Sequence, residues 1–345
     1  MIDNHYDSAP PNGNSGSMQG FEPQFTDIVD YILRITYRIW EGKQVGLCRD
    51  YYSENCPIYT LSGYTEGAEQ VTQNTIKTLS GFPDRTLHAD NIIWGGNDVD
   101  GYHTSHLITT NMTNLGPSEF GPATGQRAQF QVIAHCVVHE NRIVEEWLVR
   151  DNYALAQQLG VDPEHYALEQ AEKPLNQDST FAKWCSSEIE RVSSQARERI
   201  AYTDAGEEGL IKAALQNIWN ARLLGDCQIL YAPNARLHAS ARDDYDGVDN
   251  IERFYMEILG SIPDARLTLD YSCSNSMLDG DYVAVRWTLA GHHGGDALWG
   301  PATNAPLLII GESHYRFIDG QVVEEWTVFD ELAVLTQVAR ARLSD

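Results

Sequence analysis

The chain has 345 residues, 42% of them hydrophobic, and this length is enough for about two domains with separate hydrophobic cores. Its formal net charge of −25 at pH 7, with no dense cluster of lysine and arginine, disfavours nucleic acid and anionic membrane surfaces as partners. No apolar run approaches the roughly 18 residues of a membrane span, and the N-terminus lacks a signal-peptide pattern, so we expect a cytoplasmic protein.

The first domain is predicted to begin with helices. Residues 1–24 are rich in Asn, Gly, Ser and Pro and offer little apolar surface, so we expect a disordered tail there. A helix follows, in which apolar residues recur at helical spacing: Phe25, Ile28, Ile32, Ile35 and Ile39. A second helix starts after Gly67 and stops at Gly81, shortly before Pro83.

The rest of the first domain, and the matching part of the second half of the chain, have the pattern of β-strands. Each ends in a hairpin whose turn is plainest at Asp319-Gly320, between residues 314–317 and 322–326. Because helices come first and strands follow, we predict an α+β fold. The first domain is expected at 25–160.

The connection between the two domains is predicted to be a linker at 161–180, since it contains Pro163, Pro174 and many polar residues. The second domain then spans 181–345 and starts with an additional amphipathic helix that could dock one domain on the other. The apolar stripe of this helix comprises Cys185, Ile189, Val192, Ala196 and Ile200.

The two halves of the chain repeat each other. The pattern Glu-Glu-Trp-x-x-x-Asp ends at Asp151 and again at Asp330, an offset of 179 residues (330 minus 151). The same offset relates Gly-Pro-Ala-Thr at 121–124 to the copy at 300–303. It also pairs single residues: His135 with His314, Cys48 with Cys227, and Trp40 with Trp219. So many matches in one register indicate a tandem duplication.

This doubled pattern resembles the SnoaL-like polyketide cyclase family, over about 25–160 and 205–345. The resemblance implies the cone-shaped fold of the nuclear transport factor 2 superfamily, in which a curved, mostly antiparallel sheet wraps a deep apolar pocket closed by helices. It also implies a small hydrophobic, polyketide-like substrate and no cofactor. Because most relatives are single domains that dimerise, we expect the two domains to form a pseudo-dimer within one chain, with homo-oligomerisation left open.

The resemblance also implies a set of catalytic residues. In the family, an Asp at the end of the final strand removes an acidic proton from the polyketide, and a His on a neighbouring strand assists. The corresponding residues are Asp151 with His135 in the first domain, and Asp330 with His314 in the second.

Strand geometry supports a base at these positions but leaves an alternative open. Side chains alternate along a strand, so Trp147 and Asp151 share one face, as do Trp326 and Asp330. If this face points inward, burial would raise the pKa of each Asp and make its carboxylate a stronger base. Alternatively, each Asp is the N-cap of the helix that follows. The adjacent glutamates at 145/146 and 324/325 are interpreted as solvated edge residues.

Further residues are candidates for binding the substrate or stabilising an enolate: Arg286, His106, Tyr282, Tyr102, Trp326, Trp147, His292 and His293. The spacing of the histidines on regular strands does not suit shared zinc ligation, so we predict no metal site. Because Arg286 and the His292-His293 pair accompany Asp330, the second domain is the preferred active site.

Three functions fit these observations. The first is a cofactor-independent cyclase or isomerase that uses an Asp as general base. The second is a hydrolase or dehydratase in the same fold, in which the base activates water or a hydroxyl group. The third is a non-catalytic protein that binds a small molecule.

Overall fold

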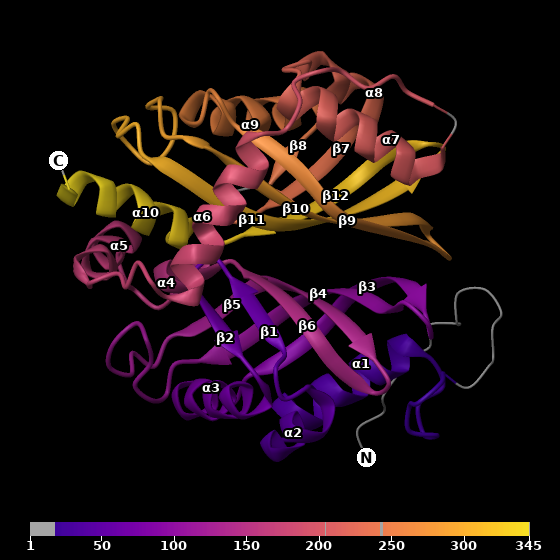
Figure 1. The fold of residues 1–345 in the computed structure, drawn as a ribbon, viewed down its shortest axis with the longest axis vertical. Coiled ribbons are helices and arrows are strands. Elements are labelled where there is room, and N and C mark those ends of the chain that lie inside the picture. Colours follow the sequence, from indigo (N-terminus) through magenta and orange to yellow (C-terminus); the bar gives the residue numbers. More distant parts are fainter. Residues whose placement is uncertain (1–17, 204, 242–243, 345) are drawn as a thin grey trace.

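The computed structural model describes residues 18–203, 205–241 and 244–344. They form two α+β domains, and each consists of a six-stranded sheet and a set of helices (Figure 1). Of the expected tail at 1–24, residues 1–17 lie outside the described residues. The remaining residues are packed against the domain, since Met18 is buried and the Gln19 amide donates to Asp98.

The described part of the first domain contains four α-helices and two short helical turns of other types. The helices are α1 (Ile28–Thr36), α2 (Cys48–Tyr51), α3 (Ala68–Gly81) and α4 (Asn152–Gln158), and the turns are η1 (Tyr37–Glu41) and η2 (Val45–Leu47). Its strands are β1 (Pro57–Thr60), β2 (Gly63–Glu66), β3 (Thr86–Asn97), β4 (Gly101–Thr113), β5 (Arg127–His139) and β6 (Arg142–Arg150), in the order β2-β1-β6-β5-β4-β3. All neighbouring strands are antiparallel except β1 and β6.

The second domain repeats this arrangement. Its helices are α7 (Gly206–Leu215), α8 (Cys227–Leu230), α9 (Val248–Ser261) and α10 (Glu331–Ser344), with turns η3 (Gln216–Asn220) and η4 (Leu224–Asp226). Its strands are β7 (Tyr231–Ala239), β8 (Tyr245–Asp246), β9 (Arg266–Met277), β10 (Gly280–His292), β11 (Pro306–Ile318) and β12 (Gln321–Phe329), in the order β8-β7-β12-β11-β10-β9. The predicted fold class and the tandem arrangement are therefore confirmed.

Local sequence accounts for the main boundaries of these elements. Helices α3 and α9 follow Gly67 and Gly247, both at φ 84°, a left-handed conformation that favours glycine. A Cβ on Gly67 would also lie 2.3 Å from the carbonyl oxygen of Glu54. In the β11–β12 hairpin, Asp319 and Gly320 have φ of 51° and 78°, as a type I′ turn requires.

The connection between the domains is more ordered than the expected linker at 161–180. It contains α5 (Pro163–Glu172), because Asp162 caps the helix and Pro163 suits its first position. Helix α6 (Thr180–Ser193) follows and contacts β2 of the first sheet and β9, β10 and β11 of the second. It ends before Ala196 and Ile200, so only the first three residues of the predicted stripe lie on it.

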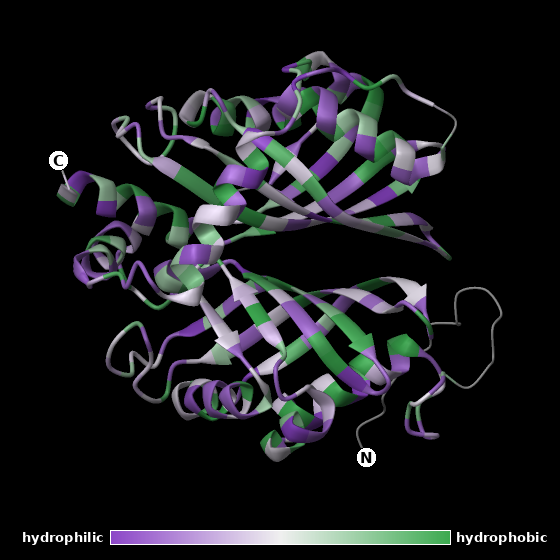
Figure 2. Cartoon of the chain, viewed as in Figure 1, coloured by the Kyte–Doolittle hydropathy of each residue, from purple (hydrophilic) through white to green (hydrophobic). Residues whose placement is uncertain are grey.

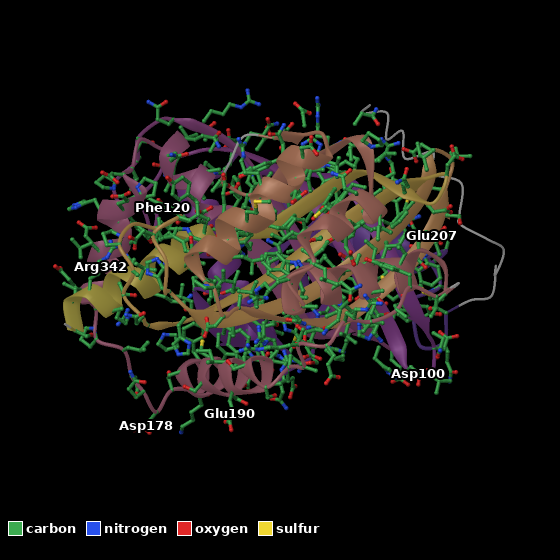
Figure 3. The ribbon with its side chains drawn as sticks, turned by 90° about the horizontal axis from the view of Figure 1, so that it is seen from above. Asp100, Phe120, Asp178, Glu190, Glu207 and Arg342 are labelled. Carbon is green, nitrogen blue, oxygen red and sulfur yellow. The ribbon has the colours of Figure 1, made fainter. Side chains whose placement is uncertain are left out.

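The two sheets face each other in the middle of the molecule, and α1–α3 and α7–α9 cover their outer faces (Figure 1). Hydrophobic residues recur along the strands and the covering helices of both domains (Figure 2). Asp100, in the β3–β4 turn, lies at the opposite end of the molecule from Phe120 and Arg342 (Figure 3). Within the described residues, no helix is both long and apolar enough to cross a membrane.

Candidate functional site

The first domain contains a cavity of about 320 Å³ between its sheet and its helices. Its outer part is lined by polar side chains of the β1–β2 hairpin, α3 and the loop before β5, including Thr60, Asn74 and Glu119. Its inner part continues into a hollow of about 60 Å³. The cavity and the hollow share six lining residues: Trp40, Tyr52, Arg85, Glu146, Leu148 and Arg150. Ile32, Ile35, Leu87 and Ile108 line the inner end, so the cavity has a polar mouth and an apolar end.

Glu146 is the buried carboxyl group of this cavity. Burial raises its pKa to about 7, although a hydrogen bond from Tyr52 and the positive charge of Arg150 both favour the ionised form. Near neutral pH the group therefore exists in both protonation states, which suits a general acid or base. Glu146 was interpreted as a solvated edge residue from the sequence, and this interpretation is wrong because the helices cover its face of the sheet.

Cationic and neutral nitrogen groups line the same cavity. Arg85 lies just before β3, and Arg150 is the last residue of β6. Burial, with the neighbouring Arg150, lowers the pKa of Arg85 to about 9, so the guanidinium stays charged at neutral pH. His106 lines the inner hollow, and burial lowers its pKa to about 3, which leaves a neutral ring.

The corresponding hollow of the second domain is almost filled, with a volume of about 20 Å³. Gly311 of β11 occupies the position of Val132 in β5, and the Trp287 ring takes the space this leaves. A Cβ on Gly311 would lie 2.1 Å from that ring. The Trp287 indole N–H donates to Ser313 at 3.0 Å, so the ring is held in place.

Glu325, the equivalent of Glu146, is enclosed by hydroxyl groups. It accepts hydrogen bonds from Tyr231 and Thr327, and burial raises its pKa to about 7. Phe329 stands where the first domain has Arg150. The second domain therefore keeps the carboxyl group but neither the open space nor the cation beside it.

The two histidines predicted to assist catalysis lie between the sheets of the two domains. The His135 Nδ1 is 2.9 Å from Glu312 Oε1, and its Nε2 is 3.1 Å from His103 Nδ1. His314 Nε2 is 2.7 Å from the Ser105 hydroxyl, which also donates to Glu312. Except for His103, these side chains are buried, and none is among the lining of the three hollows described above.

The two aspartates cap helices at the same interface. Asp151 accepts from the Ala154 amide at the start of α4, and its second oxygen accepts from Ala241 of the other domain at 2.9 Å. Asp330 accepts from the Ala333 amide of α10 and from the Asn152 side chain at 2.6 Å. Burial raises the pKa of Asp330 to about 7. The structure thus shows the capping role, and neither side chain lines the three hollows.

Strand alternation was predicted correctly, but the face that was expected to point into the pocket does not. Glu146, Leu148 and Arg150 face the cavity, whereas Trp147 stacks on Tyr59 and lies under the guanidinium of Arg286. Both faces of the strand are buried, one by helices and one by the other domain, so an aromatic residue does not identify the cavity side. In the second domain, Trp326 likewise stacks on His238 rather than lining a hollow.

The other candidate residues have different surroundings. His106 and Arg286 do not occupy equivalent positions. His106 pairs with Ala134, whereas Arg286 pairs with Glu312, which the offset of 179 residues relates to the residue before Ala134. This shift of one position places the two side chains on opposite faces of their sheets. Tyr102 and Tyr282 donate to Asp98 and Asp279 beside the hairpin turns. His292 binds Asp264, and His293 is within hydrogen-bond distance of Thr303 and the Leu298 carbonyl.

Sequence reasoning missed Glu146, Arg85, Arg150 and Tyr52. For Glu146 and Arg150, the only signal in the sequence is that alternation places them on the same face of the strand as Leu148. Alternation does not show which face of the strand points into the cavity. In the described part of the chain, no group of three or more His, Cys, Asp and Glu side chains is placed to hold a metal ion.

Comparison with known proteins assigns a family to both halves. The model of the SnoaL-like polyketide cyclase family matches residues 30–159 and 210–338. Similar solved structures include IdmH from Streptomyces antibioticus (25% identity, 38% of this chain and 97% of that one, TM-score 0.33) and TsrD from Streptomyces laurentii (19%, 41% and 99%, TM-score 0.34). A SnoaL-like protein from Jannaschia sp. CCS1 is also similar (17%, 41% and 98%, TM-score 0.34). Among proteins with curated descriptions, none matches.

Proposed function

Since this chain belongs to the SnoaL-like polyketide cyclase family, we propose that it is a cofactor-independent cyclase or isomerase whose reaction takes place in the cavity of the first domain. The substrate is a largely hydrophobic, polyketide-like molecule, and Glu146 is the general base. This assignment moves the site away from the second domain, which the sequence alone favoured.

The observation that carries the proposal is the position of Glu146. A carboxyl group with a pKa of about 7 lines an open cavity that has a polar mouth and an apolar end. Such a group is ionised in a large fraction of molecules at neutral pH and still basic enough to take a carbon-bound proton next to a carbonyl group.

The proposed reaction starts when the Glu146 carboxylate takes a proton from carbon between two carbonyl groups. The electron pair of that C–H bond becomes an enolate, whose negative charge is stabilised by the positive potential that Arg85 and Arg150 create in the cavity. In a cyclase, the enolate carbon attacks a second carbonyl carbon of the same molecule and forms a C–C bond. The resulting alkoxide takes the proton back from Glu146. In an isomerase, the proton returns to a different carbon of the enolate.

The second domain serves in this proposal as the partner that a separate subunit would otherwise provide, so that the chain is a pseudo-dimer. The contacts between the sheets support this role, because Glu312 receives hydrogen bonds from Ser105 and from His135, both of the first domain. The backbone of Trp94 is also bonded in both directions to the Asn275 side chain.

The test begins with mass spectrometry of small molecules that co-purify with the protein, followed by turnover measurements on the identified compound. Glu146→Gln keeps the shape of the side chain and removes the base, so we expect a loss of at least about a hundredfold in kcat. The matched control is Glu325→Gln, the same change at the equivalent position of the filled second domain, which should retain turnover. Full activity of the Glu146 variant would refute the proposal.

A further inference from the structure

The cavity of the first domain contains two arginines that have no bonded partner. Arg85 and Arg150 both line its inner part, and the Nε atom of each is buried without a hydrogen-bond acceptor. Among the described residues, neither side chain takes part in a hydrogen bond or an ion pair. The two arginines are half-buried, and a buried polar atom such as each Nε costs free energy when it stays unsatisfied, so such atoms are usually paired.

The charges around the two arginines do not balance. Arg85 and Arg150 repel each other across the cavity. The carboxyl groups that line the cavity are Glu146, which is only partly ionised near pH 7, and Glu119, which lies in the loop at the mouth. A chain with a net charge of −25 therefore encloses a positively charged hollow. Like charges that are partly removed from water are stabilised by an opposite charge, and an anionic ligand in this open cavity would supply it.

The second domain provides an internal comparison. Ala265 occupies the position of Arg85, since both follow a Pro-Asp step and both amides bond to the third residue before them. Phe329 occupies the position of Arg150. Both cations are thus absent from the domain whose hollow is filled and present in the domain whose cavity is open. This coincidence links the arginines to what the cavity binds rather than to the stability of the fold.

We propose that the molecule bound in the first domain carries a carboxylate, and that Arg85 and Arg150 together hold this group. The planar guanidinium offers paired N–H donors that match the two oxygens of a carboxylate. The hydrophobic body of the ligand lies against Ile35, Leu87 and Ile108 at the apolar end. The inference rests on the proposed function, and it narrows the substrate class from a hydrophobic polyketide-like molecule to a hydrophobic acid.

A pair of probes that differ only in charge tests the inference. We would titrate 2-naphthoate and its neutral counterpart 2-naphthamide into the protein at pH 7 and follow the heat of binding. The wild type should bind the acid at least about tenfold more tightly than the amide. Arg85→Met and Arg150→Met, singly and together, should remove this preference. Arg34→Met, which changes an exposed arginine paired with Asp30, should leave it unchanged.

The Arg variants are also informative without a ligand. Because each substitution removes a half-buried charge that lacks a bonded partner, the melting temperature of the unliganded Arg85→Met protein should equal or exceed that of the wild type. A large loss of stability would show that the arginine supports the fold and would overturn the inference. Equal binding of acid and amide by the wild type, or no binding of the acid at millimolar concentration, would also overturn it.

Glu146→Gln separates this inference from the proposed function. The variant lacks a carboxylate near the arginines and should bind naphthoate as tightly as the wild type or more tightly. If Glu146→Gln abolishes turnover while the wild type binds naphthoate no more tightly than naphthamide, the assignment of the base is correct and the assignment of the anion site is wrong. If the Arg variants lose the acid preference while Glu146→Gln still turns over substrate, the anion site is correct and the base is wrong.

Discussion

The guanidinium carbon of Arg286 lies 3.2 Å from the centre of the Trp147 ring, although the two residues belong to different domains. Both residues are half-buried, and this burial lowers the pKa of Arg286. Cation–π pairs contribute from about 0.5 kcal/mol at exposed sites to about 2 kcal/mol where water is excluded. The residue that the sequence suggested as an enolate-stabilising group thus helps to hold the two sheets together.

We predict that Arg286→Met and Trp147→Leu each lower the free energy of unfolding, and that the double variant loses less than the sum of the two. The coupling free energy from this cycle should be about 1–2 kcal/mol, measured by urea denaturation at pH 7. Arg34→Met with Trp147→Leu is the control pair and should be additive. Additivity in the Arg286 cycle would show that the stacked geometry does not stabilise the protein.

Because the Trp287 ring packs against Gly311, we predict that substitutions at these two positions can reopen the filled hollow of the second domain. Gly311→Val alone should destabilise the protein by about 1–3 kcal/mol or more, because its side chain would overlap the Trp287 ring. Combining it with Trp287→Ile recreates the Val132 and Ile108 pair of the first domain and should recover part of this loss. Thermal unfolding would measure the recovery, and an equal or larger loss in the double variant would contradict it.

The pH dependence of activity should report the ionisation of Glu146. A general base acts in its deprotonated form, so kcat/KM should rise as the pH increases through about 7 and then level off. The Glu325→Gln variant should show the same profile, since its substitution lies in the other domain. An activity that stays constant from pH 5 to pH 8 would exclude a base with the pKa of Glu146.

Asp330→Asn should preserve turnover and change the pH dependence of stability. Asn also caps helices, so the start of α10 is retained. The folded-state pKa of Asp330 is raised to about 7, so its stabilising contribution is full below the unfolded pKa and is lost as the pH rises through about 7. The variant should therefore gain stability relative to the wild type between pH 4 and pH 8 in denaturant titrations. A hundredfold loss of turnover would return the chemistry to Asp330.

The sequence was sufficient to predict the tandem α+β fold because its signals are local. Apolar spacing indicates α1, the positive φ at Gly67 requires a glycine before α3, and Asp319-Gly320 specifies a hairpin turn. These features do not depend on residues far away in the chain. The offset of 179 residues then extends each prediction from one half to the other.

The site was not predictable in the same way because it depends on which face of a strand the helices cover. Trp147 and Glu146 are neighbours on β6, and both sides of that strand are buried. The contact that occupies the Trp147 side comes from Arg286, which no local pattern relates to β6. The one-position difference between His106 and Arg286 is likewise visible only in the strand register.

The filled hollow around Trp287 has a consequence for how such a chain can change over generations. In a dimer of identical subunits, every substitution is present twice, so a tryptophan that occupies one cavity occupies both. Fusion of the two copies into one polypeptide removes this constraint, because Gly311 and Val132 can vary independently. One copy is then free to acquire a tightly filled interior, and the other retains an internal void that stability alone would select against.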